Sequence, residues 1–407
     1  MDIQPEKRNL IIMWFANFFV GASMTMVIPF LSLYIDSLGQ YSDEEVQRWA
    51  GFVFGISFLV AFFVSPIWGK IGDRFGRKKV LIGTGFGIAI SVFLMGYVNS
   101  VEALFVLRLF MGLATGFIPA SMALIAAQSS KRTAGETLGT LQTGTVSGGL
   151  LGPLFGGLIA DGVGMELTFI LTSAILCVAA LLVVFGVKEV LYEEKGEKKK
   201  HYRSKEVVQH IVKSPMLIMV MIVALIIQMA LFSVQPLLAL FVDDLTNSPE
   251  NMAFLAGVAF SITGLGNLLS TRRWGQLGDK IGHEKVMLIL LILSGILFIP
   301  QGFVDSLWQL ISLRFLFGLA VGGLIPCTTA FIRLSCPVSM QGEVLGYNQS
   351  FRFLGNVLGP VTGGMVAASF GISYVFIGSG VLLLLTAVAL KLVLNAGRES
   401  RQEENSA

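Results

Sequence analysis

Long apolar blocks alternate with short polar segments along the whole chain. Each block holds about 20 residues with few charges, enough for a helix to cross a hydrocarbon core of roughly 30 Å. A soluble core of this size would show amphipathic stripes instead. The pattern predicts an all-α membrane protein with transmembrane helices at 10–35, 49–69, 80–98, 101–125, 137–160, 166–187, 216–242, 252–271, 286–303, 308–332, 343–369 and 372–394.

Composition supports this reading. Of the 407 residues, 54% are hydrophobic and only 14% are charged, whereas a typical soluble domain carries about 25% charged residues. The three cysteines are scattered, which indicates neither a disulfide framework nor a metal site. We therefore expect no cofactor and no metal. The first apolar block has no small-residue cleavage site, so we interpret it as a retained helix and not a signal peptide.

The positions of the charges predict the topology. Most of the 29 Lys and Arg residues fall on one side of the expected helices, a few such as Arg108 lie within helices, and Arg48 alone lies on the opposite side. The opposite loops are acidic, with Asp36, Glu102 and Asp161 among them. By the positive-inside rule, both termini are predicted to be cytoplasmic in a bacterial inner (plasma) membrane.

The two halves of the chain repeat each other at an offset of 206 or 207 residues. The matched pairs include Pro29 with Pro236, Asp36 with Asp243, Gly69 with Gly275, Asp73 with Asp279, Arg108 with Arg314, and Gly152-Pro153 with Gly359-Pro360. Six helices per half predict two parallel bundles related by a pseudo-two-fold axis along the membrane normal. We place the N-terminal bundle at 1–187, a cytoplasmic linker at 188–215, and the C-terminal bundle with its short tail at 216–407. The basic cluster of the linker is either simply solvated or in contact with lipid headgroups.

Three motifs stand out. The loop Gly69-Lys70-Ile71-Gly72-Asp73-Arg74-Phe75-Gly76-Arg77 places glycines at a tight turn, and a weaker copy runs from Gly275 through Asp279. It is either a gating element or an ordinary basic loop. Gly148, Gly152 and Pro153 predict a close-packed, bent helix, or a general small-residue seam. Arg108 lies within an apolar helix, so it is a functional candidate unless it snorkels to the outer interface.

Together these motifs resemble the major facilitator superfamily, in particular its twelve-helix drug:proton antiporters and the MdtG-type bacterial multidrug efflux transporters. The fragments Ile28-Pro29-Phe30-Leu31, Ser65-Pro66-Ile67-Trp68-Gly69 and Tyr347-Asn348-Gln349-Ser350-Phe351-Arg352 carry the closer match. The resemblance covers the whole chain and implies proton-driven export of varied amphipathic compounds by alternating access. It also implies that Arg108 takes part in proton coupling and that the loop and glycine motifs act as conformational gates.

Candidate substrate contacts lie on helices expected to line the transport path. Asn348, Gln349, Arg352 and Asn356 fall on one face of a helix, and such a polar face is expected to point into the bundle or a water-filled cavity. Arg352 either binds an anionic or hydrogen-bonding group of the substrate or makes a structural pair. Its counterpart is Thr145, which predicts a lopsided charge distribution. The other candidates are Asn17, Met24, Gln142, Gln228, Phe232 and Gln235.

The carboxylate that carries the proton is harder to assign. No acid lies at the centre of the first helix, and Asp36 lies at its outer end. Glu136 and Glu343 lie at cytoplasmic helix ends. Asp36 is our candidate, and the alternative is that it is a solvated helix terminus.

Other functions are less well supported. A proton symporter for uptake of a sugar or other metabolite would keep the fold, but the Pro-Glu-Ser-Pro-type signature of sugar porters is missing after the sixth helix. Walker A, His-Glu-x-x-His and Gly-x-Ser-x-Gly patterns are also missing, so the sequence does not favour an enzyme. A non-transporting sensor would need an output domain, and we expect the linker and the short tails to be too small to form one. We expect small-molecule substrates, protons and membrane lipids as partners, no nucleic acid, and a monomer.

Overall fold

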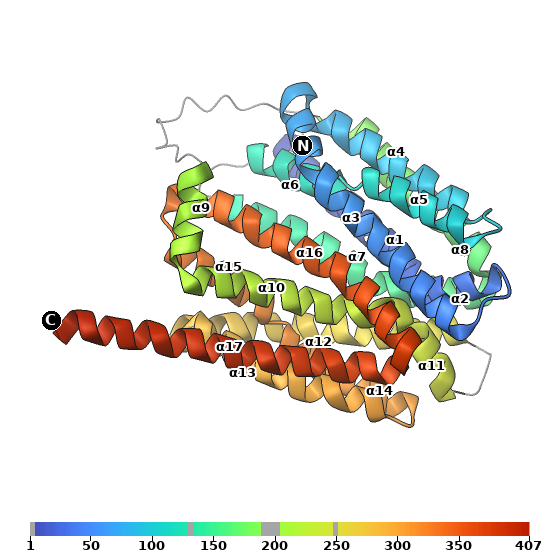
Figure 1. Cartoon of the computed structure of the whole chain (residues 1–407). Helices are drawn as coiled ribbons and strands as arrows, with labels where there is room; N and C mark the ends of the chain where they lie inside the picture. The colour runs from blue at the N-terminus through green and yellow to red at the C-terminus, as the bar shows by residue number, and fades with distance from the viewer. Residues whose placement is uncertain (1–4, 129–133, 189–203, 247–250, 407) are drawn as a thin grey trace. The chain divides into compact units, whose positions relative to one another are not determined.

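The computed structural model describes residues 5–128, 134–188, 204–246 and 251–406. Within these ranges the elements are helices, and twelve helical spans are long and apolar enough to cross a membrane. The all-α membrane architecture predicted from the sequence is confirmed. The helices group into two compact units, Met1–Lys195 with Pro236–Ser261, and Gly196–Gln235 with Ile262–Ala407 (Figure 1).

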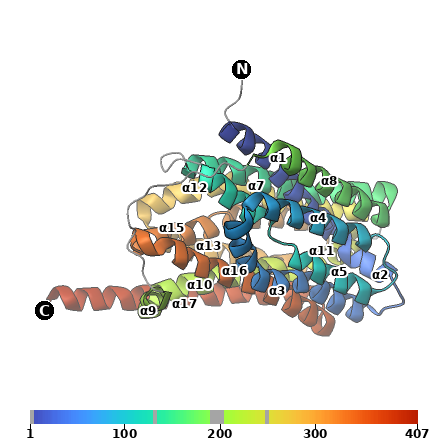
Figure 2. The same cartoon turned by 90° about the horizontal axis from the view of Figure 1, so that it is seen from above.

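The first unit contains the helices of the N-terminal half. They are α1 (Pro5–Met26), the 3-10 turn η1 (Ile28–Phe30), α2 (Leu31–Ser37), α3 (Asp43–Phe75), α4 (Arg77–Met95), α5 (Val101–Leu113), α6 (Phe117–Gln128), α7 (Ala134–Val163) and α8 (Met165–Gly186). α11 (Leu238–Thr246) and the first part of α12 (Met252–Ile281) also belong to this unit. Figure 2 shows α4 and α5 side by side.

The second unit contains the remaining helices. They are α9 (Ser204–Lys213), α10 (Pro215–Val234), the rest of α12, α13 (His283–Phe298), the 3-10 segment η3 (Ile299–Phe303), α14 (Leu307–Val321), α15 (Leu324–Ser335), α16 (Val338–Phe370) and α17 (Ile372–Ser406). The 3-10 turn η2 (Gln235–Leu237) joins α10 to α11. α17 continues well beyond the predicted end at 394.

Four predicted spans are interrupted in the structure. The breaks follow α1 and α10 at η1 and η2, and they separate α5 from α6 and α14 from α15. Pro29 and Pro236 lie in the two 3-10 turns, where a residue without an N–H is tolerated. The breaks fall at equivalent places in the two repeats, so they belong to the duplicated architecture.

Glycines let the first helix of each repeat pack closely on the fifth. A Cβ built on Gly148, Gly152 or Gly156 of α7 would meet the carbonyl oxygens of Phe18, Ala22 and Met26 in α1. In α16, the same test at Gly355, Gly359 and Gly363 meets the carbonyl oxygens of Leu225, Met229 and Ser233 in α10. The three glycines and the three carbonyl groups that they meet each have a counterpart in the other repeat at an offset of 207 residues. The contact is backbone against backbone, so any side chain would force the helices apart.

A tryptophan hydrogen bond between two helices also occurs at the same place in both repeats. Trp68 Nε1 donates to the carbonyl oxygen of Leu113 at 2.7 Å, and Trp274 Nε1 donates to that of Leu319 at 2.7 Å. Both pairs join the second helix of a repeat to its fourth and differ by 206 residues. The duplication inferred from the sequence is therefore also present in the contacts of the fold.

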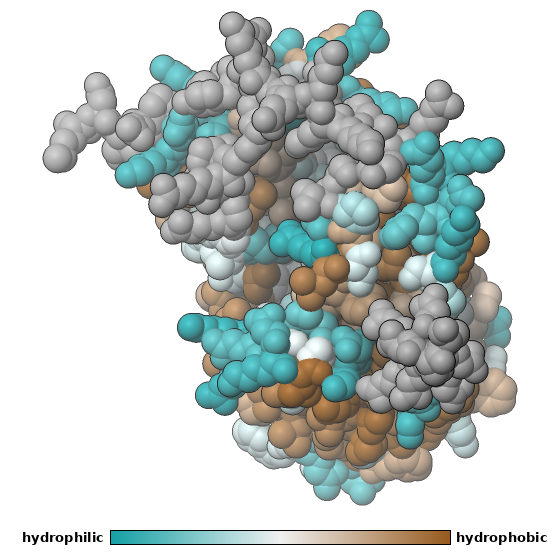
Figure 3. All heavy atoms as spheres, turned by 90° about the vertical axis from the view of Figure 1, so that its left-hand side faces the viewer, coloured by the Kyte–Doolittle hydropathy of each residue, from teal (hydrophilic) through white to brown (hydrophobic). Residues whose placement is uncertain are grey.

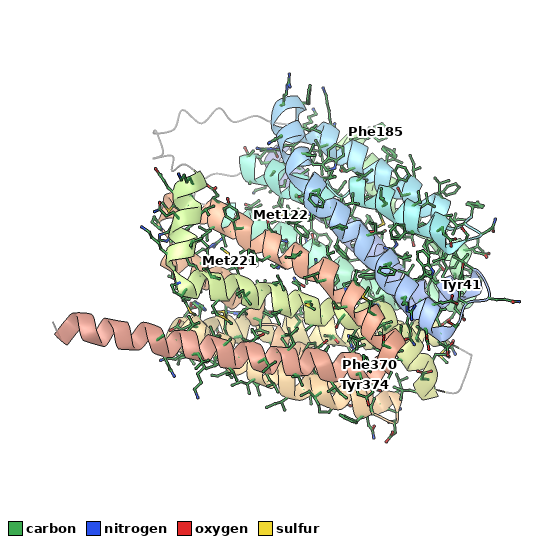
Figure 4. The ribbon with its side chains drawn as sticks, in the orientation of Figure 1. Tyr41, Met122, Phe185, Met221, Phe370 and Tyr374 are labelled. Atoms are coloured by element: carbon green, nitrogen blue, oxygen red, sulfur yellow. The ribbon has the colours of Figure 1, made fainter. Side chains whose placement is uncertain are left out.

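Large apolar side chains remain exposed on the outer helices. Phe185 of α8, Phe370 of α16 and Tyr374 of α17 point outward in Figure 4, and Phe185 is 84% exposed. A soluble protein rarely leaves so many large apolar groups in water, whereas lipid tails accept them. The helix ends are more polar than this outer surface: the end seen in Figure 3 carries hydrophilic residues, in teal, beside apolar ones.

Candidate functional site

The polar face predicted on α16 is present, and it is built around Arg352. Arg352 Nη1 donates to Gln349 Oε1 at 2.9 Å, one turn earlier on the same helix. Across the seam, the carboxamide oxygen of Gln228 on α10 accepts from Arg352 Nε at 3.1 Å and from Nη2 at 3.0 Å, in the amide orientation that satisfies both groups. Two candidate residues, Gln228 and Gln349, thus hold the guanidinium in one orientation.

Two asparagines extend this face in both directions. Asn348 is 3% exposed and Asn356 is 8% exposed, and neither carboxamide oxygen has a hydrogen-bond partner among the described residues. They lie four residues before and after Arg352, so the three side chains follow one stripe of α16. Buried acceptors without partners are uncommon in folded proteins, which marks this stripe as unusual.

The remaining candidates on α10 and η2 lie close in sequence to Gln228. Phe232 is half-buried, and its Cβ is 3.1 Å from the position that a Cβ at Gly359 would take. The side-chain oxygen of Gln235 is buried without a partner. Gln228 and Phe232 lie on α10, and Gln235 begins η2.

The first unit contributes a different polar residue. Asn17 on α1 is fully buried, and within the described ranges neither its side-chain oxygen nor its side-chain nitrogen has a hydrogen-bond partner. Thr145 on α7, the counterpart of Arg352, also has a buried hydroxyl without a partner. Met24 is half-buried and Gln142 is exposed.

Arg108 lies deep within its helix and does not reach the surface. It is 6% exposed, its guanidinium carbon lies 6.0 Å from the centroid of the Phe54 ring, and its Nε has no hydrogen-bond partner in the described part of the chain. The structure therefore does not support snorkelling to an interface. Its repeat counterpart Arg314 is 5% exposed. Asp36, in contrast, is exposed near the end of α2.

Most of the predicted loop is helical: residues 69–75 form the last turns of α3, and Gly76 alone makes the turn into α4. The prediction of a longer glycine turn was therefore wrong, because the chain keeps its helical hydrogen bonds until a glycine with positive φ ends the helix. Gly76 has φ 98°, a backbone conformation that glycine adopts readily, and Gly282 in the second copy has φ 99°. Arg77 Nη1 donates to the Ala123 carbonyl oxygen at 2.7 Å, beside a cavity of about 260 Å³ that Gly69 also lines. Arg74 lies over the neighbouring Phe75 ring. The side chain of Asp73 lies outside the described residues, so its predicted charge relay stays a prediction.

The second copy of the loop uses different side chains. His283 takes the place of Arg77, and its Nε2 lies 3.3 Å from Asp279 Oδ1. A Cβ at Gly275, like one at Gly69, would meet no atom within 4 Å. In the glycine motif, Gly152 packs against α1 as described above. Pro153 lies inside α7, which continues as one helix through it.

The sequence profile of the major facilitator superfamily matches residues 13–273 and 253–407. The chain belongs to this superfamily. It is 53% identical over 388 residues to the uncharacterized MFS-type transporter YuxJ of Bacillus subtilis, covering 95% of this chain and 99% of that one. It is 41% identical over 389 residues to multidrug resistance protein MdtG of Enterobacter lignolyticus, covering 95% and 92% of the two chains.

Solved structures of the superfamily share the fold. A bacterial homologue of the human lysosomal transporter Spinster, in an inward-facing and occupied conformation, matches with a TM-score of 0.82 over 97% of this chain and 98% of that one. The nucleoside transporter NupG matches with a TM-score of 0.77 over 96% and 99%. At 13% and 14% identity, these likenesses establish the architecture alone.

Two polar contacts of this superfamily member are absent from the sequence-based predictions. Asn9 Nδ2 donates to Gln128 Oε1 at 2.9 Å and to the Lys188 carbonyl oxygen at 2.6 Å, and its Oδ1 accepts from Lys188 N at 3.1 Å. One side chain thus ties α1 and α6 to the end of α8. The Asn9-Leu10-Ile11 fragment was part of the family match, but its partners are more than 100 residues away.

Asp161 makes the second of these contacts. Its two carboxylate oxygens accept from the backbone N–H groups of Ala253 at 3.1 Å and Phe254 at 2.7 Å. These are the first turns of α12, where free N–H groups and the helix dipole favour a negative charge. Sequence analysis treated Asp161 only as an acidic loop residue, because nothing local indicates which helix it would cap.

Proposed function

We propose that this transporter exports drugs or other amphipathic small molecules across the bacterial inner membrane and couples export to proton entry. The observation that carries the proposal is the match to multidrug resistance protein MdtG over nearly the whole of both chains. Polar residues within otherwise apolar spans support it, since such groups mark transport paths in membrane proteins. The proposed substrate contacts are those around Arg352 together with Asn17, Met24 and Gln142.

The proposed mechanism is alternating access by rocking of two six-helix bundles. The glycine seams support it, because backbone contacts along α1–α7 and α10–α16 make each helix pair rigid. The proposed conformational gates are residues of the loop motif, its second copy and the glycine motif of α7: Gly69, Asp73, Arg74, Gly76, Arg77, Gly275, Asp279, Gly152 and Pro153.

Proton coupling is assigned to Arg108 and Asp36. A guanidinium enclosed in an apolar helix bundle acts on nearby protons through its charge, which water does not screen there. Asp36 supplies an exposed carboxylate that exchanges protons with the outer solution. The chain itself is proposed to act as a monomer with both termini in the cytoplasm.

The test is substrate-driven proton movement in liposomes that contain the purified protein and a pH-sensitive dye. Lipophilic cations, neutral drugs and anions are added to the parent and to Arg108→Gln, Asp36→Asn and Arg48→Gln. Arg48 is a surface residue 3.7 Å from Glu44, so its variant is the control for loss of an arginine. Loss of proton flux in Arg108→Gln alone or with Asp36→Asn supports the assignment. Transport that moves no protons in the parent refutes coupling.

A further inference from the structure

The guanidinium of Arg352 is held entirely by neutral partners. Gln228 and Gln349 accept three of its N–H bonds. No described carboxylate is in ion-pair contact with it. A guanidinium has five N–H donors, so two of them have no partner in the described part of the chain.

Neutral glutamines orient a positive charge without neutralising it. In an apolar span, a charge is normally paired, hydrated or in contact with a substrate path. Holding a guanidinium fork from two sides pre-organises it for a planar anionic group, which accepts two parallel hydrogen bonds. A purely structural arginine would use all five donors, or pair its charge with a carboxylate of the fold.

The asparagines on the same face supply a second observation. The carboxamide oxygens of Asn348 and Asn356 are buried and accept no hydrogen bond. At 1.5 Å per residue, the stripe from Asn348 to Asn356 is about 12 Å long, the length of a drug-sized molecule. An occupant that satisfies this stripe presents an anionic group at its centre and hydrogen-bond donors beside it.

We propose that Arg352 binds the carboxylate of a transported compound that also carries hydroxyl or amine hydrogens for Asn348 and Asn356. This inference rests on the proposed transport function, since it names the substrate class of the same site. It assigns the charge recognition to the second unit, with Gln228 and Gln349 as positioning residues.

A matched pair of fluorescent probes tests the assignment. Purified protein in detergent is titrated with 7-hydroxycoumarin-3-carboxylate and, separately, with its uncharged ethyl ester, and binding is followed by fluorescence anisotropy at mildly acidic pH. The parent is expected to bind the carboxylate at least about tenfold more tightly than the ester, as one charge-assisted pair provides. This comparison needs no variant, so a folding defect cannot obscure it.

Variants then locate the charge. Arg352→Gln is expected to remove the preference for the carboxylate, and Arg352→Lys to retain part of it, because lysine keeps the charge but not the fork. Arg333→Gln, at an exposed residue of the same unit, is the matched control and should retain the full preference. Asn356→Leu should weaken both probes. Equal binding of carboxylate and ester by the parent, or a preference that survives in Arg352→Gln, overturns the proposal.

Two further arms separate the alternatives. Displacement of the carboxylate probe by phosphatidylglycerol but not by a soluble carboxylate would assign the site to a lipid headgroup and overturn the substrate assignment. Export of ethidium from liposomes measures transport itself. Ethidium export without a carboxylate preference would leave the proposed function intact and refute the anion site. Failure of every tested compound to move would refute the proposed function, while the binding titration would still decide the anion site.

Discussion

Replacing a seam glycine by alanine should loosen the first unit by an amount that the structure allows us to work out. The Cβ added in Gly144→Ala lies 2.6 Å from the Trp14 carbonyl oxygen, and ordinary van der Waals contact begins at 3.4 Å. The shortfall is 0.8 Å (3.4 − 2.6). Because the Trp14 oxygen belongs to the backbone, no side-chain rotation can relieve the clash, and α1 must move away from α7.

The expected destabilisation follows from this geometry. Overpacking a tight contact costs about 1–3 kcal/mol, and a rigid backbone neighbour favours the upper end. Alanine stabilises a helix interior by about 0.5–1 kcal/mol relative to glycine, which offsets part of that cost. The net loss is about 2 kcal/mol. For a bundle of this size, it lowers the melting temperature by roughly 4–8 °C.

The matched control is Gly149→Ala on the same helix. A Cβ at Gly149 meets no atom within 4 Å, so this variant gains the helix preference of alanine without the clash. Thermal unfolding of both purified variants, followed by intrinsic tryptophan fluorescence in one detergent, gives the comparison. Melting temperatures that agree within about 1 °C, well inside the expected difference, would refute the reasoning that these glycines are required by backbone contact.

Three further predictions concern polar groups outside the apolar spans or at their ends. Asn9→Ala leaves buried partners unsatisfied and should lower stability by about 1–3 kcal/mol; an unchanged melting temperature would contradict this. Asp161→Ala should increase amide hydrogen exchange at Ala253 and Phe254. Asp305→Ala, which removes another exposed acid, should cause no such increase. Equal exchange in both variants would refute the helix cap by Asp161. Burial raises the pKa of the Cys336 thiol, so less thiolate is present at pH 8 and maleimide should label it more slowly in folded than in unfolded protein, with the gap narrowing as pH rises. Equally fast labelling in both states would contradict that shift.

The sequence predicted the parts of the fold that depend on periodic patterns. The apolar blocks predicted the membrane spans. The offset of 206 or 207 residues predicted the duplication, and Gly148 and Gly355 make equivalent contacts in the two repeats. The helix breaks at η1 and η2 were missed, because Pro29 and Pro236 lie within continuous apolar runs. Hydrophobicity alone does not distinguish a straight span from one with a 3-10 turn.

The sequence predicted which candidate residues share a face of one helix, but not how residues on different helices pair. Asn348, Arg352 and Asn356 were found because a spacing of four residues places them on one face. The role of Gln228 as a partner of Arg352 depends on how α10 packs on α16, and no local pattern encodes that contact. The same limit explains Asn9 and Asp161, whose partners are about 90 or more residues distant.

The two repeats differ in charge at a position beside the glycine seams. At three seam positions, a glycine meets a carbonyl oxygen of the facing helix in both repeats, so a side chain is excluded there on steric grounds: Gly148 and Gly355, Gly152 and Gly359, Gly156 and Gly363. The neighbouring position carries Thr145 in one repeat and Arg352 in the other, with a buried hydroxyl in the first and an oriented cation in the second. Close helix packing therefore restricts the glycines while leaving adjacent positions free to change in charge. A duplicated scaffold of this kind can acquire charge selectivity in one unit without repacking either seam.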